Sequence, residues 1–336
     1  MDATACTYAI ETHGLTKSFH RKRAVDNVDL HVPAGSIYGL VGKNGAGKST
    51  LLKLVSGLLR RDAGSVSIFG SPHASCQTDA RLGILIEKPA VYERLDPFEN
   101  LMNRALVLGL PNPKQACREV LALVGLSERE AGDGEFRLLW PRGSYTDDLS
   151  TGMRQRLGVA LALIGNPEVL VLDEPFSGID PAGAKSIRNT IRRLSRERGV
   201  TVIVSSHTIA HLERICTHFG IMRAGGLIRE VTSAELLEAR TARLVVRVTN
   251  PECAVALLAE GMPDLVLSVL KDGQLTIQMT PELEKDEGRA ALSELLMRGG
   301  VAVTEMRPVA TDLEGELVRL MEGVHAAGGT HPEGRR

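Results

Sequence analysis

A glycine-rich stretch at residues 42–50, GKNGAGKST, has the residue types that bind phosphate. It fits the pattern G-x-x-x-x-G-K-[ST], in which glycines let successive backbone N–H groups turn inward around an anion. Lys48 can then reach the β- and γ-phosphates of a nucleotide, and the Ser49 hydroxyl can ligate Mg²⁺. The alternative interpretation is an ordinary glycine turn before a helix. The pattern predicts a nucleotide-binding loop made of Gly42, Lys43, Asn44, Gly45, Ala46, Gly47, Lys48, Ser49 and Thr50.

Two adjacent acids, Asp173 and Glu174, end an aliphatic run at residues 167–175. Phosphoryl transfer to water needs one carboxylate near Mg²⁺ and one group that orients or deprotonates the water. Asp173 suits the first role and Glu174 suits the second. Two acids at the end of a strand are often only a solvated strand end, but the phosphate loop earlier in the chain favours the catalytic interpretation.

The elements around these residues predict an α/β fold. Short aliphatic runs alternate with helical patterns, and the helix after the phosphate loop is predicted at 48–59. This alternation indicates a mostly parallel, three-layer α/β sheet. Ligands bind at the carboxyl ends of such strands, so we expect the loop, the acid pair and His207 to converge. The buried strands are predicted at 36–41, 81–87, 167–175 and 199–207.

Other segments add antiparallel strands and a helical subdomain. Residues 7–32 predict two strands around a turn, 65–70 another strand, and 219–231 a hairpin. Helical patterns dominate about 90–165, apart from a polar, glycine-containing segment at 127–148 that predicts a long loop.

Two aromatic residues leave alternatives open. Phe19 lies just upstream of the phosphate loop, where its ring is expected either to stack on adenine or to join the core. Trp140 is the only tryptophan of the chain and lies inside the loop 127–148. It is either an anchor for a partner protein or part of a small core against the helical subdomain.

The pattern changes near residue 240, where strands and helices follow in the order β-α-β-β-α-β. This is the order of a ferredoxin-like split unit, and the chain of 336 residues is long enough for two domains. We therefore expect a nucleotide-binding domain at 1–232, a smaller α+β domain at 233–322 and a disordered tail at 323–336.

Composition excludes some classes of protein. Hydrophobic residues make up 43% and charged residues 24% of the chain, which is typical of a globular protein. The net charge of −1 argues against a dedicated nucleic-acid binder. No run reaches the length of about 18 apolar residues that suggests a membrane span, and the N-terminus lacks a signal peptide pattern. The five cysteines are far apart and odd in number, which favours reduced thiols in the cytoplasm.

Further motifs make residues 7–231 resemble the nucleotide-binding subunits of ABC transporters. The sequence LSTGMRQR at 149–156 resembles the signature motif of that family, and SGIDP at 177–181 resembles its D-loop. His207 is at the place of the switch histidine, and Glu87 is at the Q-loop position. The resemblance implies the P-loop NTPase fold of an ABC cassette.

The resemblance also implies a mechanism that one chain cannot complete. Two cassettes, here expected as a homodimer, face each other and bind ATP between them. The signature residues of one cassette would contact the γ-phosphate held by the other; they are Ser150, Thr151, Gly152 and Met153. The catalytic residues would be Glu174, His207, Glu87 and Lys48, with Ser49, Asp173 and Glu87 around Mg²⁺. The alternative interpretation of this segment is a helix start with Ser150 as its N-cap, and both interpretations can be true at once.

In the family, hydrolysis drives a separately encoded, multi-span membrane subunit, so the resemblance implies a cytoplasmic protein on the inner face of the cell membrane. Three departures stand out: Thr151 and Met153 where many members have glycine and glutamine, Glu87 for the usual glutamine, and a longer loop at 127–148. The segments LIE and GMRQRL and the additional C-terminal domain resemble the subgroup that exports drugs, peptide antibiotics such as bacitracin, or lantibiotics, including self-resistance systems.

Two other functions fit the sequence less well. A soluble ABC-type ATPase that acts on ribosomes or DNA would be expected to have two cassettes, a long coiled coil or a basic excess. A regulatory module that does not hydrolyse ATP would not need Glu174 and Lys48.

Overall fold

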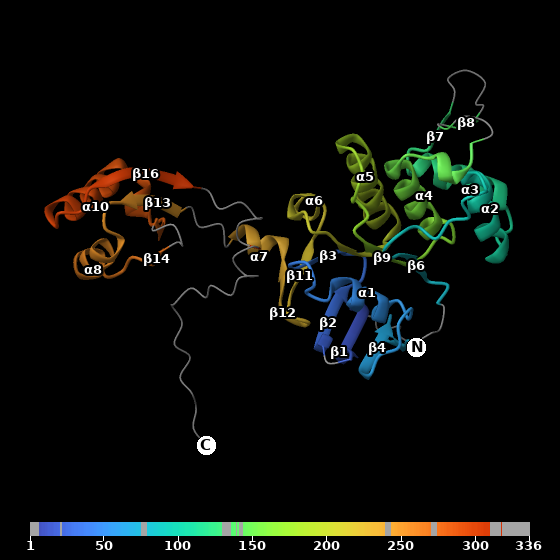
Figure 1. Ribbon diagram of the computed structural model, residues 1–336, viewed down its shortest axis with the longest axis horizontal. Helices are drawn as coiled ribbons and strands as arrows, with labels where there is room; N and C mark the ends of the chain where they lie inside the picture. Colours follow the sequence, from blue (N-terminus) through green and yellow to red (C-terminus); the bar gives the residue numbers. More distant parts are fainter. Residues whose placement is uncertain are drawn as a thin grey trace. The chain divides into compact units, whose positions relative to one another are not determined.

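The computed structural model describes residues 7–20, 22–74, 79–129, 136–138, 140, 144–238, 243–269, 274–309 and 317. The chain divides into two compact units, Met1–Ser233 and Ala234–Arg336 (Figure 1). Each unit is described by itself.

The first unit is built on a six-stranded sheet with the order β12-β11-β3-β10-β9-β6. All neighbouring strands are parallel except the β11–β12 hairpin. Every residue of β3, β9 and β10 is buried, which explains why these strands are continuous aliphatic runs. The prediction of a mostly parallel α/β sheet is confirmed. The bounds are β3 Ile37–Val41, β6 Leu82–Leu85, β9 Val169–Asp173, β10 Thr201–Ser205, β11 His218–Arg223 and β12 Gly226–Thr232.

A second, antiparallel sheet has the order β2-β1-β4-β5. Helix α1 (Lys48–Val55) joins the two sheets, because one hydrophobic core contains Leu15 and Val28 of this sheet, Leu52 of α1, and Val171 and Ile203 of the parallel sheet. The phosphate loop that precedes α1 is therefore fixed between two packed layers. The strands are β1 Tyr8–Phe19, β2 Lys22–Pro33, β4 Ala63–Ile68 and β5 Ser71–Pro72.

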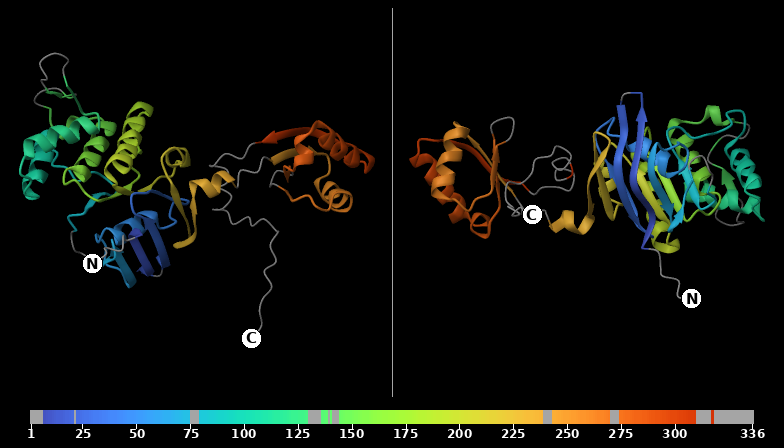
Figure 2. Two further views of the ribbon diagram at one scale, coloured as in Figure 1. Left: turned by 180° about the vertical axis from the view of Figure 1, so that it is seen from behind. Right: turned by 90° about the horizontal axis from the view of Figure 1, so that it is seen from below.

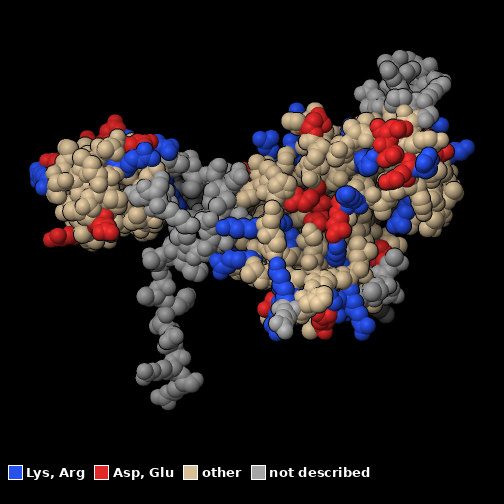
Figure 3. Space-filling model, in the orientation of Figure 1, with Lys and Arg blue, Asp and Glu red and all other residues tan. Residues whose placement is uncertain are grey.

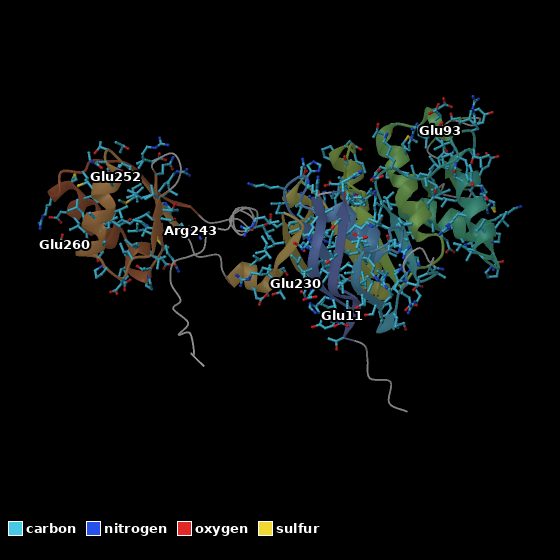
Figure 4. All side chains as sticks on the ribbon, turned by 60° about the horizontal axis from the view of Figure 1, so that its bottom comes forward. Glu11, Glu93, Glu230, Arg243, Glu252 and Glu260 are labelled. Carbon is cyan, nitrogen blue, oxygen red and sulfur yellow. The ribbon has the colours of Figure 1, made fainter. Side chains whose placement is uncertain are left out.

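Glu230 of β12 ties the two sheets together by hydrogen bonds, and Figure 4 labels it. Its carboxylate accepts hydrogen bonds from the Tyr38 hydroxyl at 2.6 Å and from the His31 backbone N–H at 3.0 Å. Burial, and then the charge of Glu230, raise the pKa of Tyr38 well above its usual value. Tyr38 therefore stays a hydrogen-bond donor to this carboxylate.

Helices α2 (Pro97–Val107), α3 (Pro113–Leu123) and α4 (Thr151–Leu163) form the helical part of this unit, which Figure 2 shows from two sides. The sequence starts α2 with a capping box between Asp96 and Glu99 and a proline in the first turn. Helix α5 (Pro181–Arg198) begins with an Asp180 cap and ends at Gly199 with φ 65°. The short helix α6 (Ile209–Glu213) follows β10.

The segment expected to be one long loop contains ordered structure, so that prediction is wrong in part. Strands β7 (Ser127–Arg129) and β8 (Phe136–Leu138) form an antiparallel pair, and a 3₁₀ turn spans Thr146–Asp148. Both strands are too short to show an alternating apolar pattern. The Thr146 hydroxyl donates to the Leu95 carbonyl at 2.7 Å, which fixes the end of the segment to the start of α2.

The second unit has a four-stranded antiparallel sheet with the order β14-β15-β13-β16 and its own hydrophobic core against α8 and α10. This is the strand arrangement of a ferredoxin-like split unit. The tail predicted at 323–336 lies outside the described residues, as do residues 270–273 and, apart from Leu317, residues 310–322. The elements are α7 Ser233–Glu238, β13 Arg243–Val248, α8 Pro251–Gly261, β14 Leu267–Val269, β15 Leu275–Gln278, α9 Pro281–Glu284, α10 Asp286–Arg298 and β16 Val303–Val309.

Within the described ranges, no helix combines the length and the apolar character that crossing a bilayer requires.

Candidate active site

The glycine-rich loop runs from the end of β3 to the first residue of α1, as the sequence predicts. Gly47 has φ 105°, and a Cβ atom there would lie 2.3 Å from the Ala24 carbonyl oxygen, so only glycine fits. Lys43, Asn44 and Gly45 are exposed, and Ala46 is buried. The loop thus offers backbone N–H groups and the helix N-terminus to an anion.

Lys48 is 7% exposed, and its ammonium donates a hydrogen bond to the Gly42 carbonyl at 2.7 Å. Burial lowers the pKa of Lys48, while the nearby charges of Glu174 and Asp173 act in the opposite direction. The lysine of the loop therefore lies in the electrostatic reach of both acids, as the strand-end argument predicts.

Asp173 is the last residue of β9 and is almost fully buried. Its Oδ1 atom accepts a hydrogen bond from the Ser205 hydroxyl at 2.5 Å, because strands β9 and β10 place these residues side by side. The same hydroxyl accepts a hydrogen bond from the Glu174 backbone N–H at 3.1 Å. Sequence reasoning missed Ser205; its place at the carboxyl end of β10 was the available signal.

Glu174 and His207 are brought together by the ends of β9 and β10. The His207 Nδ1 atom lies 2.7 Å from the Glu174 Oε2 atom, so Nδ1–H donates to the carboxylate. Glu174 has φ 49°, a left-handed conformation that is rare for a residue with a side chain. Such conformations collect at functional sites, because the surrounding structure must hold them. The geometry suits a carboxylate that is aimed at a water molecule by a histidine.

The site offers oxygen ligands that suit Mg²⁺: the Ser49 hydroxyl and the Asp173 carboxylate. In the described part of the chain, no three His, Cys, Asp or Glu residues form a metal cage. Mg²⁺ usually keeps several waters and takes further ligands from substrate phosphates, so it needs only a few oxygen ligands from the protein. When bound, the ion would neutralise charge on the phosphates.

Glu87 lies two residues beyond the end of β6, so the observed strand is shorter than the strand predicted at 81–87. It has φ 61°, and its side chain, 64% exposed, forms an ion pair with Lys53 of α1. The structure thus places Glu87 at the surface and shows no contact between it and Asp173.

The signature residues lie at the start of α4. The Ser150 hydroxyl caps this helix by accepting a hydrogen bond from the Met153 N–H at 3.2 Å. Ser150 and Thr151 are exposed, whereas Gly152 and Met153 are half-buried. In the next helical turn, the Gln155 side chain donates to the Glu174 carbonyl at 3.3 Å. Helix α4, which begins with the expected signature residues, therefore contacts the backbone of Glu174 in the same chain.

Phe19 is 45% exposed at the end of β1, so the interpretation as a core residue is wrong. The Lys17 ammonium lies 5.6 Å from the centre of its ring. An exposed aromatic face remains available for a nucleotide base.

The parallel sheet, the glycine loop at its carboxyl edge and the Asp173–Glu174 pair define an ATPase of the P-loop class. The family profile described as "ABC transporter" matches residues 25–177, and one described as "AAA domain, putative AbiEii toxin, Type IV TA system" matches the shorter range 144–212.

The chain is 33% identical over 319 residues to an uncharacterised ABC transporter ATP-binding protein, YcbN of Bacillus subtilis, covering 94% of this chain and 98% of that one. It is 33% identical to the bacitracin transport ATP-binding protein BcrA of Bacillus licheniformis, covering 94% and 97%. It is also 33% identical to the lantibiotic transport ATP-binding protein SrtF of Streptococcus pyogenes, covering 68% and 94%. The dimeric cassette MJ0796 has a TM-score of 0.58 at 24% identity, covering 67% of this chain and 98% of its own.

The chain therefore belongs to the ABC transporter family, as an ATP-binding subunit that hydrolyses ATP.

Proposed function

We propose that this subunit powers the export of a drug or peptide antibiotic, of the bacitracin or lantibiotic kind, through a separate membrane protein. The observation that carries the proposal is the extent of the similarity to the bacitracin transport protein. It spans 317 residues and thus includes the second unit, whereas the lantibiotic transport relative matches only 231 residues. Of the two, this favours a bacitracin-like peptide as the substrate.

We propose a role for each of the site residues. The loop residues 42–50 bind the ATP phosphates, Ser49 and Asp173 hold Mg²⁺, and Phe19 stacks on the adenine. Glu174 acts as the base toward water, with His207 as its orienting partner at 2.7 Å. Glu87 adds an oxygen ligand at the edge of the site when the membrane protein and ATP are bound.

A second copy of the chain completes the site. Ser150 and Thr151 are exposed at the start of α4, so the helix N-terminus that should contact a γ-phosphate is open to a partner. The similarity to a cassette whose structure is described as dimeric supports a dimer. ATP between two copies then acts as a bridge that hydrolysis removes.

A groove of the first unit suits the membrane protein. Its volume is about 510 Å³, and it lies between β6, α2 and the segment after β6 that carries Glu87. Three large apolar side chains that line it are strongly exposed: Leu58, Tyr92 and Val107. We therefore place the chain at the cytoplasmic face of the cell membrane, with this groove on its partner.

The alternative, a soluble ATPase that acts on a macromolecule such as nucleic acid, has less support. Figure 3 shows acidic and basic side chains interspersed over the visible face of the first unit, which does not favour a polyanion.

Antibiotic susceptibility tests the proposal in the organism that carries the gene. Deletion of the gene should increase sensitivity to bacitracin-like peptides several-fold, and the wild-type gene should restore resistance. Lys48→Ala should fail to restore it, because the cation that neutralises the phosphates is lost. Lys114→Ala, an exposed lysine of α3, is the matched control and should restore it. Unchanged sensitivity after deletion of the gene would reject this substrate class, provided that the wild-type protein hydrolyses ATP.

A further inference from the structure

Two histidines of one short segment hold two side chains that follow β9. His207 contacts the Glu174 carboxylate, and four residues later the His211 ring packs against the Phe176 ring, with centroids 5.0 Å apart. Phe176 is almost fully buried. The segment from His207 to His211 therefore contacts the chain after β9 at two residues, Glu174 and Phe176.

Arg188 of α5 is the third member of this group. It is 7% exposed, and its Nη1 atom lies 2.8 Å from the His211 Nδ1 atom. A guanidinium group only donates hydrogen bonds, so Nδ1 must be the acceptor and the ring must be neutral, with its proton on Nε2. Burial is the largest cause that lowers the pKa of Arg188, followed by the charges of Arg214 and Arg192. A buried arginine whose hydrogen-bond partner is a neutral histidine adds little stability, which points to another reason for its placement.

The position of this group in the chain suggests that reason. Phe176 comes directly before the SGIDP turn at 177–181, and Arg188 lies two turns into the helix that follows it. Gly178 of the turn is close to the signature, since a Cβ atom there would lie 2.9 Å from the Thr151 Cγ2 atom. Both sides of the turn are thus attached to the segment that carries His207.

We propose that Phe176, Arg188 and His211 form a positioning cluster that holds His207 against Glu174 and links this contact to the SGIDP turn. The cluster touches neither substrate nor metal; it acts through His207. The inference rests on ATP hydrolysis by the family and not on the identity of the transported molecule.

Protonation of His211 would break the cluster. Burial is the largest cause that lowers the pKa of His211, followed by the charges of Arg188 and Arg214 and then His207, with Glu174 opposing them. Since the folded state prefers the neutral ring, the cluster is intact above about pH 6.5, the ordinary value, and is lost as the pH falls through the lowered pKa. A second proton on Nδ1 removes the acceptor of Arg188 and adds a like charge beside it. The ATPase kcat should therefore decrease on the acid side.

Steady-state ATPase kinetics of the full-length chain, measured from above to below about pH 6.5, test the proposal. His211→Leu keeps an apolar group beside Phe176 but removes the acceptor, and should lower kcat on the order of tenfold with little change in KM for MgATP. His211→Gln offers an acceptor that cannot be protonated, and should restore most of kcat while removing the acidic decrease that His211 causes. His13→Gln, at an exposed histidine of β1, is the matched control and should leave kcat and its pH profile unchanged.

A wild-type kcat in folded His211→Leu, or an unchanged acidic decrease in His211→Gln, would overturn the proposal. If His211→Leu does not fold, NMR of the His211 ring in the wild-type full-length chain decides. We expect the Nε2–H tautomer and a pKa below about 6.5. A ring that is charged at neutral pH, or protonated on Nδ1, would contradict the assignment whatever the transported substrate is.

Discussion

Glu174 is the residue that we propose as the base of the hydrolysis step. Its backbone is held in a left-handed conformation by hydrogen bonds with the Ser205 hydroxyl and the Gln155 amide. Its carboxylate accepts a hydrogen bond from His207. These contacts fix the position of the carboxylate. A substitution that removes only the charge of Glu174 should therefore leave the side chain in the same place.

Glu174→Gln tests the role of base. The amide has nearly the shape of the carboxylate but cannot accept a proton, so we expect MgATP binding to persist while kcat falls by about 10²-fold or more. The variant should accumulate as an ATP-bound dimer in size-exclusion chromatography. Glu168→Gln, at an exposed glutamate just before the same strand, is the matched control. Turnover near the wild-type rate in Glu174→Gln would remove Glu174 from the role of base.

Glu87 should tolerate loss of its charge. Glutamine presents an oxygen at the same place, so Glu87→Gln should keep substantial ATPase activity and bind MgATP normally. The ion pair with Lys53 lies largely at the surface, where such pairs contribute between about 0 and 1 kcal/mol, so the melting temperature should change little. A collapse of turnover would show that the negative charge itself is needed, and comparison of the two pH–rate profiles would show whether Glu87 acts as a second base.

At the scale of elements, the segment between α3 and α4 is the part that differs most from its expected form. Trp140 follows the β7–β8 pair and is only 6% exposed. This burial favours packing within the protein over a role as an exposed anchor for the membrane partner. The segment is also attached to α2 through Thr146, whose hydroxyl accepts a hydrogen bond from the Asn100 amide at 3.0 Å.

Trp140→Ala should therefore destabilise the first unit. Truncation of a buried tryptophan typically costs about 3–5 kcal/mol, which thermal or denaturant unfolding of the purified chain would detect. Tyr145→Ala, at a residue of the same segment that is 49% exposed, is the control and should change stability much less. An unchanged melting temperature in Trp140→Ala, combined with weaker co-purification of the membrane protein, would instead support the anchor interpretation.

At the scale of the whole molecule, the chain has two units with separate hydrophobic cores. The proposed nucleotide-binding and catalytic residues all lie in the first unit. We infer that the second unit, with its ferredoxin-like sheet, serves pairing of the cassettes or regulation of the exporter and not the binding of ATP.

A truncated chain that ends at Thr232 tests this division. It retains β12, the last strand of the parallel sheet, and should bind ATP with the affinity of the full-length chain. Equilibrium titration with a nucleotide measures this, and circular dichroism shows whether the truncated chain is folded. A folded truncation that no longer binds ATP would contradict the independence of the two units.

The sequence by itself determined the features that depend on neighbours in the chain. Glycine spacing and the helical pattern after Lys48 specify the phosphate loop, because its shape is a property of the local backbone. Continuous aliphatic runs specify β3, β9 and β10, since strands covered on both faces need apolar residues throughout. The sequence motifs also indicated the ABC family, which the comparisons confirm.

Only the tertiary structure decided which distant side chains meet. The register of β9 against β10 pairs Ser205 with Asp173, and the packing of α5 against the segment after β10 brings Arg188 to His211. Glu87 was placed by motif at the edge of the site, yet the fold directs it to Lys53. Such contacts are set by strand register and by the packing of elements far apart in sequence, and no local pattern of residues encodes either one.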